Sequence, residues 1–122
     1  MAQILVVDDS FVVREGIVKA LQQLQVTVDT ATDGVDALTK IKADSELQMV
    51  ITDVNMPNMD GLQLAKHIHK ELNSRNLKVI MCTTGNSPYI KKYAKAAGVR
   101  GWIVKPFEPD LAIPAIKKLL EL

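Results

Sequence analysis

Short apolar runs alternate along this chain with segments whose apolar residues recur at helical spacing. The runs predict five strands, at residues Gln3–Val7, Val26–Ala31, Leu47–Thr52, Leu77–Cys82 and Gly101–Val104. The helical spacing predicts five helices, at residues Phe11–Leu24, Val35–Ile41, Gly61–Leu72, Pro88–Ala97 and Leu111–Leu122. Since Pro114 lies within the last of them, we expect a kink or a late start there.

Most of the predicted strands are nearly continuous apolar runs, whereas Val26–Ala31 alternates as a strand with one exposed face does. Continuous runs are typical of strands that are buried on both faces, which implies a parallel sheet with helices on each side. We therefore predict an α/β fold, a doubly wound sheet of five parallel strands with five helices. The predicted strand order is 2-1-3-4-5, which is adopted from known flavodoxin-like folds and is not worked out from this sequence.

The length of 122 residues predicts a single domain over residues 1–122. No apolar run approaches the roughly 20 residues that span a bilayer, and the N-terminus lacks a signal-peptide pattern. One cysteine, Cys82, excludes an internal disulfide and suits a reducing compartment. We therefore expect a cytoplasmic protein that does not insert into membranes and carries no output domain.

The net charge of +1 conceals an uneven distribution. Residues 1–60 carry four Lys/Arg and ten Asp/Glu, a balance of −6, whereas residues 88–122 carry seven and three, a balance of +4. The excess of basic residues in 88–122 indicates either solvated helix faces or a surface for an acidic partner, and solvated faces are the more common case. Aromatic residues make up 4% and no dense basic run occurs, which argues against nucleic-acid binding.

The stretch from Val50 to Gly61, VITDVNMPNMDG, places a carboxylate where a buried strand should end. Pro57 lacks a backbone donor, and the asparagines, Asp60 and Gly61 favour turns, so the strand stops near Asp53. A rigid strand thus precedes Asp53 and an accessible loop follows it. An acid in this position is a candidate nucleophile or metal ligand.

Ligands of open parallel sheets bind beyond the carboxyl ends of the strands. The predicted strands end in Asp8 and Asp9, in Asp53, in Thr83 and in Lys105. Three neighbouring carboxylates repel one another. A bound Mg²⁺ ion, which prefers oxygen ligands, is the simplest way to neutralise that repulsion. An ammonium and a hydroxyl opposite such a cation suit a tetrahedral anion, and Asp53 is the acid best placed to attack phosphorus.

These residues resemble the motifs of response-regulator receiver domains of the CheY type. The resemblance rests on the Asp8-Asp9 pair, the DVNMPNMDG run from Asp53, Thr83, and the Lys105-Pro106-Phe107 run. It covers essentially the whole chain. Each motif is weak alone, but their order and their places on the predicted elements make the set specific.

The resemblance implies that Asp53 accepts a phosphoryl group from a sensor histidine kinase or a histidine phosphotransfer protein. It also implies that Asp9 and Asp53 bind Mg²⁺ directly, together with the backbone carbonyl of Asn55, while Asp8 acts through water. Thr83 and Lys105 would contact the phosphoryl group. In the family, phosphorylation remodels the face made by the fourth helix, the fifth strand and the fifth helix, where a downstream protein binds.

The sequence departs from the family pattern at Trp102, where most members have Tyr or Phe. The indole is larger and its N–H needs a partner when buried, so Trp102 either stays outward in both states or anchors a partner. Lys91, Lys92 and Lys95 on the fourth helix form either a solvated face or part of that partner surface.

Three functions compete at this point. The first is a stand-alone, monomeric phosphorylation switch that is not an enzyme, with a flagellar motor or a phosphorelay as its target. The second is an interaction module that keeps the fold and the acids but does not switch, which Trp102 motivates. The third, a magnesium-dependent phosphotransfer enzyme, is disfavoured because the predicted elements leave no residues for a substrate pocket or a lid.

Overall fold

The computed structural model describes residues 2–72, 75–85 and 87–121, so the predicted helix end at Leu122 lies outside the described residues. All five strands are parallel and their order is 2-1-3-4-5, as predicted. The strands are β1 (Ile4–Val7), β2 (Val28–Ala31), β3 (Met49–Thr52), β4 (Lys78–Thr83) and β5 (Val99–Val104). The helices are α1 (Phe11–Leu21), α2 (Gly34–Ala43), α3 (Gly61–Glu71), α4 (Pro88–Ala96) and α5 (Pro109–Leu120).

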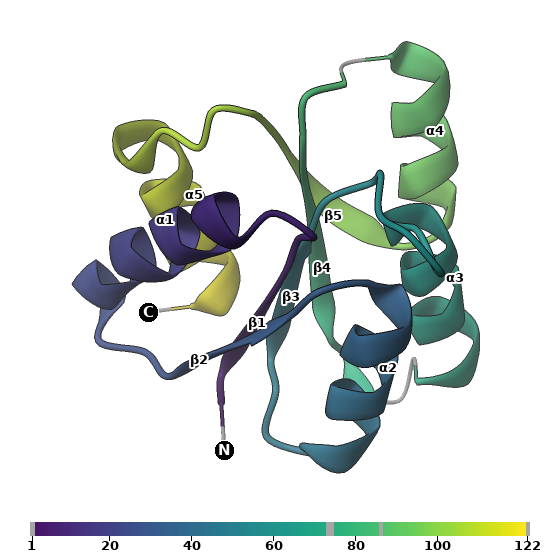
Figure 1. Cartoon of the computed structure of the whole chain (residues 1–122), viewed down its shortest axis with the longest axis horizontal. Coiled ribbons are helices and arrows are strands. Elements are labelled where there is room, and N and C mark those ends of the chain that lie inside the picture. The colour runs from purple at the N-terminus through teal and green to yellow at the C-terminus, as the bar shows by residue number, and fades with distance from the viewer. Residues whose placement is uncertain (1, 73–74, 86, 122) are drawn as a thin grey trace.

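Helices cover both faces of the sheet, with α1 and α5 on one side and α2, α3 and α4 on the other (Figure 1). Each residue of β1 and β3 is buried, because these central strands contact a helix layer on each face. Alternate residues of β1 serve the two layers: Leu5 and Val7 pack with α2 and α3, while Ile4 and Val6 pack with α1 and α5. The continuous apolar runs therefore report burial on both faces.

Several details differ from the sequence prediction. The α-helical part of α1 ends at Leu21 and a 3₁₀ turn, η1 (Gln22–Leu24), follows it, because Gln25 takes a left-handed conformation with φ of 55°. Of the kink or late start predicted at Pro114, the late start is wrong. Helix α5 begins at Pro109, and Pro114 lies on its exposed side, where water can solvate the carbonyl that loses its donor.

The helix predicted at Val35–Ile41 also differs, since α2 extends from Gly34 to Ala43 and Val35 does not face the core. Val35 is 49% exposed, whereas Ala37 and Ile41 are fully buried and contact the sheet. The Asp33 side chain caps α2, so the helix begins at Gly34, one residue before Val35. The Val35 side chain then points outward. None of the helices in the described part of the chain is long and apolar enough to cross a bilayer.

Candidate functional site

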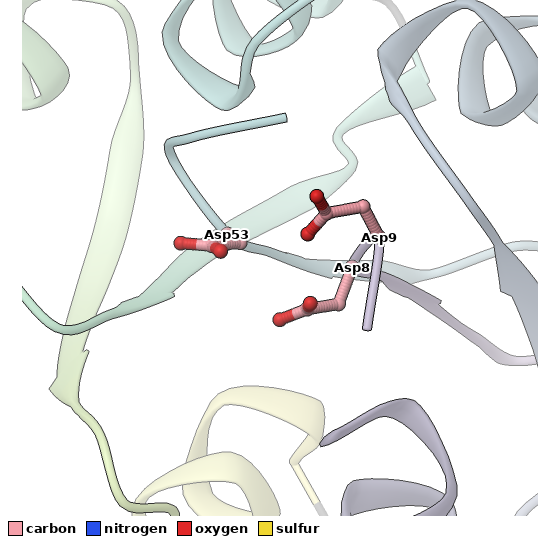
Figure 2. A group of neighbouring side chains, drawn as sticks. All are labelled: Asp8, Asp9 and Asp53. Carbon is pink, nitrogen blue, oxygen red and sulfur yellow. The ribbon is translucent and has the colours of Figure 1, made fainter. Parts of the chain in front are cut away.

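Three aspartates meet at the carboxyl ends of β1 and β3. Asp8 and Asp9 directly follow β1, and Asp53 directly follows β3. One carboxylate oxygen from each lies within 4.8 Å of the others, and Figure 2 shows the three side chains as neighbours. Asp8 and Asp53 are buried while Asp9 is exposed, so the cluster opens to solvent on the Asp9 side. The convergence predicted from the strand ends is therefore present.

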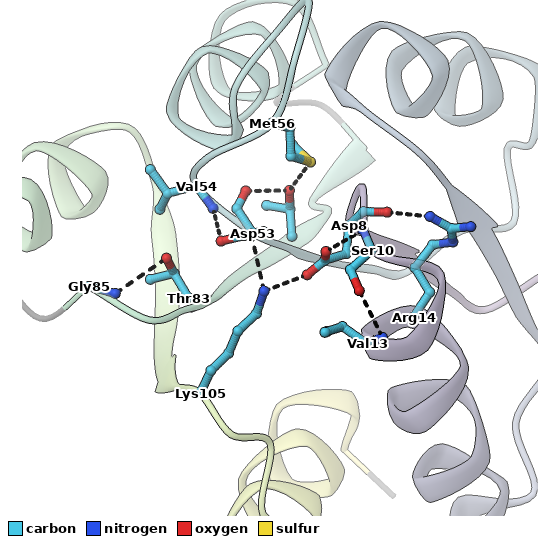
Figure 3. A network of polar contacts seen from close by, with 11 residues as sticks. Asp8, Ser10, Val13, Arg14, Asp53, Val54, Met56, Thr83, Gly85 and Lys105 are labelled. Atoms are coloured by element: carbon cyan, nitrogen blue, oxygen red, sulfur yellow. Dashed lines mark hydrogen bonds and ion pairs between the residues drawn. The ribbon is translucent and has the colours of Figure 1, made fainter.

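Lys105 closes the cluster from the end of β5. Its ammonium donates to Asp8 Oδ2 at 2.7 Å and to Asp53 Oδ2 at 3.1 Å (Figure 3). The backbone N–H of Lys105 donates to the Thr83 carbonyl at 2.9 Å, which extends the pairing of β5 with β4 up to the site. Burial by itself lowers the pKa of Lys105, but the hydrogen bonds and charges of Asp8 and Asp53 outweigh it and raise that pKa overall.

The backbone around Asp53 is held on several sides. Its N–H donates to the Val7 carbonyl at 3.0 Å, and its carbonyl accepts from the Thr52 hydroxyl at 2.9 Å. Its Oδ1 accepts from the Val54 N–H at 2.7 Å, which leaves Oδ2 facing Lys105. The start of α3 approaches so closely that a Cβ on Gly61 would lie 2.0 Å from the Asp53 carbonyl oxygen. Asp53 is therefore presented in one orientation.

The turn after β1 is fixed by two residues that the sequence interpretation did not assign to the site. The Ser10 N–H donates to Asp8 Oδ1 at 2.9 Å, and the Arg14 guanidinium donates to the Asp8 backbone carbonyl at 2.6 Å (Figure 3). The two-residue spacing of Asp8 and Ser10 is that of an Asx turn, so the first contact could have been found. Arg14 carries no such signal, because a carbonyl contact six residues away depends on the folded helix.

The remaining predicted site residues lie around this cluster. Thr83 is buried at the end of β4, and its hydroxyl oxygen accepts from the Gly85 N–H at 3.5 Å. Figure 3 places Thr83 and Lys105 on neighbouring strands beside Asp53. Asn55 lies exposed in the loop that follows Asp53. Four strand ends, those of β1, β3, β4 and β5, and one loop thus contribute to a single site.

Trp102 lies on the edge strand β5 and is partly buried. Its indole N–H donates to the Gly85 carbonyl at 3.3 Å, and the Lys91 ammonium lies 5.8 Å from the centre of its ring. Lys92 and Lys95 are exposed on the same helix as Lys91. The indole therefore contacts both α4 and the loop that carries Gly85, next to Thr83.

The donor set fits a hard divalent cation. Asp8, Asp9 and Asp53 supply oxygen ligands, and among the described residues Lys105 is the one cation that pairs with their carboxylates, so negative charge remains in excess. Mg²⁺ takes one or two carboxylates and keeps several waters, which the exposed Asp9 side allows. The acidic cluster is thus able to hold a metal ion.

A family model described as "Response regulator receiver domain" matches residues 4–117. The chain is 37% identical over 121 residues to the chemotaxis protein CheY1 of Helicobacter pylori, covering 98% of this chain and 94% of that protein. It is 35% identical over 119 residues to a chemotaxis protein CheY homolog of Campylobacter jejuni, covering 97% and 92%. The solved chemotaxis response regulator CheY4 of Vibrio cholerae is 36% identical, with a TM-score of 0.87 and 98% of each chain covered.

Proposed function

Because this chain belongs to the response regulator receiver domain family and acts as a phosphorelay receiver, we propose that Asp53 is the residue that accepts the phosphoryl group. The observation that carries this assignment is the environment of its Oδ2 atom. That oxygen faces Lys105 at 3.1 Å, at the end of a buried strand and beside two further carboxylates. Its partner Oδ1 is held by the Val54 N–H, so one oxygen is oriented for attack.

The donor would be a phosphohistidine of a sensor histidine kinase or of a histidine phosphotransfer protein. An oxygen of Asp53 forms the new bond to phosphorus, the phosphorus–nitrogen bond of the donor breaks, and the imidazole nitrogen takes a proton from solvent. Lys105 and Thr83 would bind the equatorial oxygens of the phosphoryl group. Positioning and charge neutralisation would therefore supply most of the catalysis.

The cation proposed for the acidic cluster is Mg²⁺. Asp9 and Asp53 would bind it directly with the Asn55 carbonyl, and Asp8 would bind it through water. When bound, the ion neutralises charge that develops on the phosphoryl oxygens. In the structure, Asp8 and Asp53 share the single ammonium of Lys105.

Phosphorylation would change the binding of a protein partner to the face made by α4, β5 and α5, and no external substrate would be turned over. The Gly85 N–H donates to the Thr83 hydroxyl, and the Gly85 carbonyl accepts from the Trp102 indole. Gly85 would therefore transmit a movement of Thr83 to the indole. Lys91, Lys92 and Lys95 would contribute to this face. The curated relatives are named chemotaxis proteins, which favours a chemotaxis target over another phosphorelay.

The test is to add Mg²⁺ and a small phosphodonor, or beryllofluoride, to wild type and to Asp53→Asn. We expect a phosphoryl adduct by intact mass, and a change in Trp102 fluorescence, in wild type alone. Asp29→Asn, which removes an exposed carboxylate from β2, is the matched control and should behave as wild type. Equal mass and equal fluorescence for wild type and Asp53→Asn would rule out the proposal.

A second candidate function rests on the contacts of Trp102. The indole is held by the Gly85 carbonyl and faced by Lys91, so the α4–β5 surface could be preformed and indifferent to phosphorylation. In that case the chain would be a non-switching interaction module. Binding of the downstream partner with equal affinity to the free and the beryllofluoride-loaded protein would favour this function.

A further inference from the structure

The loop between β3 and α3, residues 54–60, carries the Asn55 carbonyl that is proposed to bind Mg²⁺. The base of this loop is closed by the Gly61 N–H, which donates to the Val54 carbonyl at 2.8 Å. Among the residues that the structure describes, neither the N–H nor the carbonyl of Asn55 bonds another backbone group. The position of Asn55 therefore depends on what holds the rest of the loop.

The far end of the loop is held by the start of α2. The Asn58 side-chain amide donates to Asp33 Oδ2 at 2.7 Å, and the Gly34 N–H donates to the Met59 carbonyl at 3.0 Å. The two segments approach closely here, since a Cβ on Gly34 would lie 2.6 Å from the Met59 carbonyl oxygen. The loop tip is thus bonded to a different element from the two that carry its base.

The backbone of Asn58 suits this contact. Its φ of 66° lies in the left-handed region, which asparagine enters more readily than most residues. The Met59 N–H donates to the Pro57 carbonyl at 2.7 Å, so the chain reverses tightly at Asn58. The Asn58 side chain is exposed, and its replacement therefore leaves no cavity in the core.

Asp33 makes its two contacts with separate oxygens. Oδ1 accepts from the Asp36 N–H at 2.8 Å and caps α2, while Oδ2 accepts from Asn58. The Asp36 N–H and then the Asn58 amide hold the pKa of Asp33 below its ordinary value, so the carboxylate is charged at neutral pH. A hydrogen bond to a charged group is roughly twice as strong as one between neutral groups. Asp33 therefore joins the loop firmly to a helix that packs on the sheet.

We propose that Asn58 is a positioning residue for the metal site, because its bond to Asp33 ties the loop to α2 and holds the Asn55 carbonyl where it can bind Mg²⁺. The ligands Asp9, Asp53 and Asn55 are those of the proposed function, on which this positioning role rests. Asn58 itself touches neither the ion nor the phosphoryl group. Loss of the bond should therefore weaken Mg²⁺ binding without preventing phosphorylation.

Two substitutions break the bond from opposite sides. Asn58→Gly removes the amide and keeps the left-handed backbone, whereas Asp33→Ser keeps an oxygen to cap α2 but is too short to reach Asn58. Each should weaken Mg²⁺ binding by about threefold to tenfold, as measured by isothermal titration calorimetry. Since both remove the same bond, the double variant should lose no more than either single one. Asp36→Asn, which neutralises a carboxylate bonded to the Thr32 N–H, is the charge control and should stay within about twofold of wild type.

An exchange of the two side chains tests the contact directly. Asn58→Asp alone places two carboxylates face to face and should weaken Mg²⁺ binding, although an added negative charge near a cation site would by itself strengthen it. Adding Asp33→Asn restores a donor and an acceptor at unchanged net charge, and the new amide oxygen can still cap α2. This exchanged pair should recover the Mg²⁺ affinity of wild type to within about twofold.

Two further measurements separate positioning from a general loss of structure. In metal-free buffer, the Gly34 amide hydrogen should exchange faster in Asn58→Gly than in wild type, because its bond to the loop opens more often. At saturating Mg²⁺, a small phosphodonor should give both proteins the same amount of phosphoryl adduct by intact mass. A lower yield for Asn58→Gly at saturation would overturn the positioning role.

The calorimetric results decide between this role and the proposed function. Unchanged Mg²⁺ affinity in Asn58→Gly, or no recovery in the exchanged pair, would overturn the positioning role alone. Absence of Mg²⁺ binding by the wild-type protein would overturn it together with the proposed metal site.

Discussion

The two ends of the sheet use charged residues in opposite ways. At the carboxyl end, three aspartates share one lysine, so acidic charge is in excess. At the amino end, Arg75 donates to the Ile41 and Asp44 carbonyls at the end of α2, and Lys78 donates to the Leu119 carbonyl in the last turn of α5. Cations at helix C-termini satisfy carbonyls that lack a helical partner.

This difference separates a binding site from structural contacts. The amino end holds a cavity of about 750 Å³, yet its cations are already bonded to carbonyls. The carboxyl end has a charge imbalance that a cation or a modification can correct. Unbalanced charge is thus a better guide to the site of chemistry than cavity volume. Substitutions at the two ends test this distinction.

The largest effect is expected for Gly61→Ala at the carboxyl end. The new Cβ would lie 2.0 Å from the Asp53 carbonyl oxygen, so the loop after β3 must move and the free energy of unfolding should fall by about 2–4 kcal/mol. The response to beryllofluoride should be lost as well. Gly16→Ala is the matched control. Its Cβ meets nothing within 4 Å, and urea unfolding should show a gain of about 0.5–1 kcal/mol.

Lys105→Met should lower the free energy of unfolding by about 2 kcal/mol in metal-free buffer, because Asp8 and Asp53 lose their shared counter-charge. Mg²⁺ should then restore more stability to the variant than it adds to wild type. Thermal unfolding with and without Mg²⁺ measures this difference. Equal stabilisation of both proteins by Mg²⁺ would contradict the charge imbalance inferred at this end.

Arg75→Ala and Lys78→Ala at the amino end should each cost about 1 kcal/mol of unfolding free energy through lost carbonyl contacts. Neither variant should change the Mg²⁺ affinity or the beryllofluoride response, both of which Trp102 fluorescence can follow. A change in Mg²⁺ affinity for either variant would mean that the two ends are coupled. The distinction between them would then fail.

The smallest effect is expected for Asp33→Asn, at the start of α2. The pKa of Asp33 is lowered from 3.8, chiefly by the Asp36 N–H and then by the Asn58 amide. The charge therefore stabilises the fold above the unfolded pKa, and this contribution is lost as the pH falls through the lower folded value. The variant should be about 0.5 kcal/mol less stable at neutral pH and low salt. Urea unfolding should show this gap closing in acid, and a constant gap would contradict it.

Much of the fold could be predicted from local pattern. Continuous apolar runs marked β1 and β3 because each of their residues is buried, and Asp33 and Asp60 begin helices through side-chain caps that any sequence reading can find. The errors arose where tertiary contacts overrode the pattern. Val35 is exposed although it is apolar, and α5 extends across Pro114 because its buried face is held against the sheet.

The candidate site was likewise predictable from the sequence only in part. The strand ends predicted that Asp8, Asp9, Asp53 and Lys105 would meet, since parallel strands share one carboxyl edge. Arg14, the Val54 N–H and the close approach of Gly61 could not be predicted. Each depends on where a helix or a loop comes to lie against the strand, and no spacing in the chain encodes that placement.

The sequence by itself determined which residues could react, because hydrophobic periodicity places the strand ends to within one residue and the acids follow those ends. Only the tertiary structure decided how they are oriented. Lys105 lies 97 residues from Asp8 along the chain, yet it bonds Asp8 at 2.7 Å. Side-chain direction and neighbouring charge arise from the packing of distant segments, so they appear only once the chain is folded.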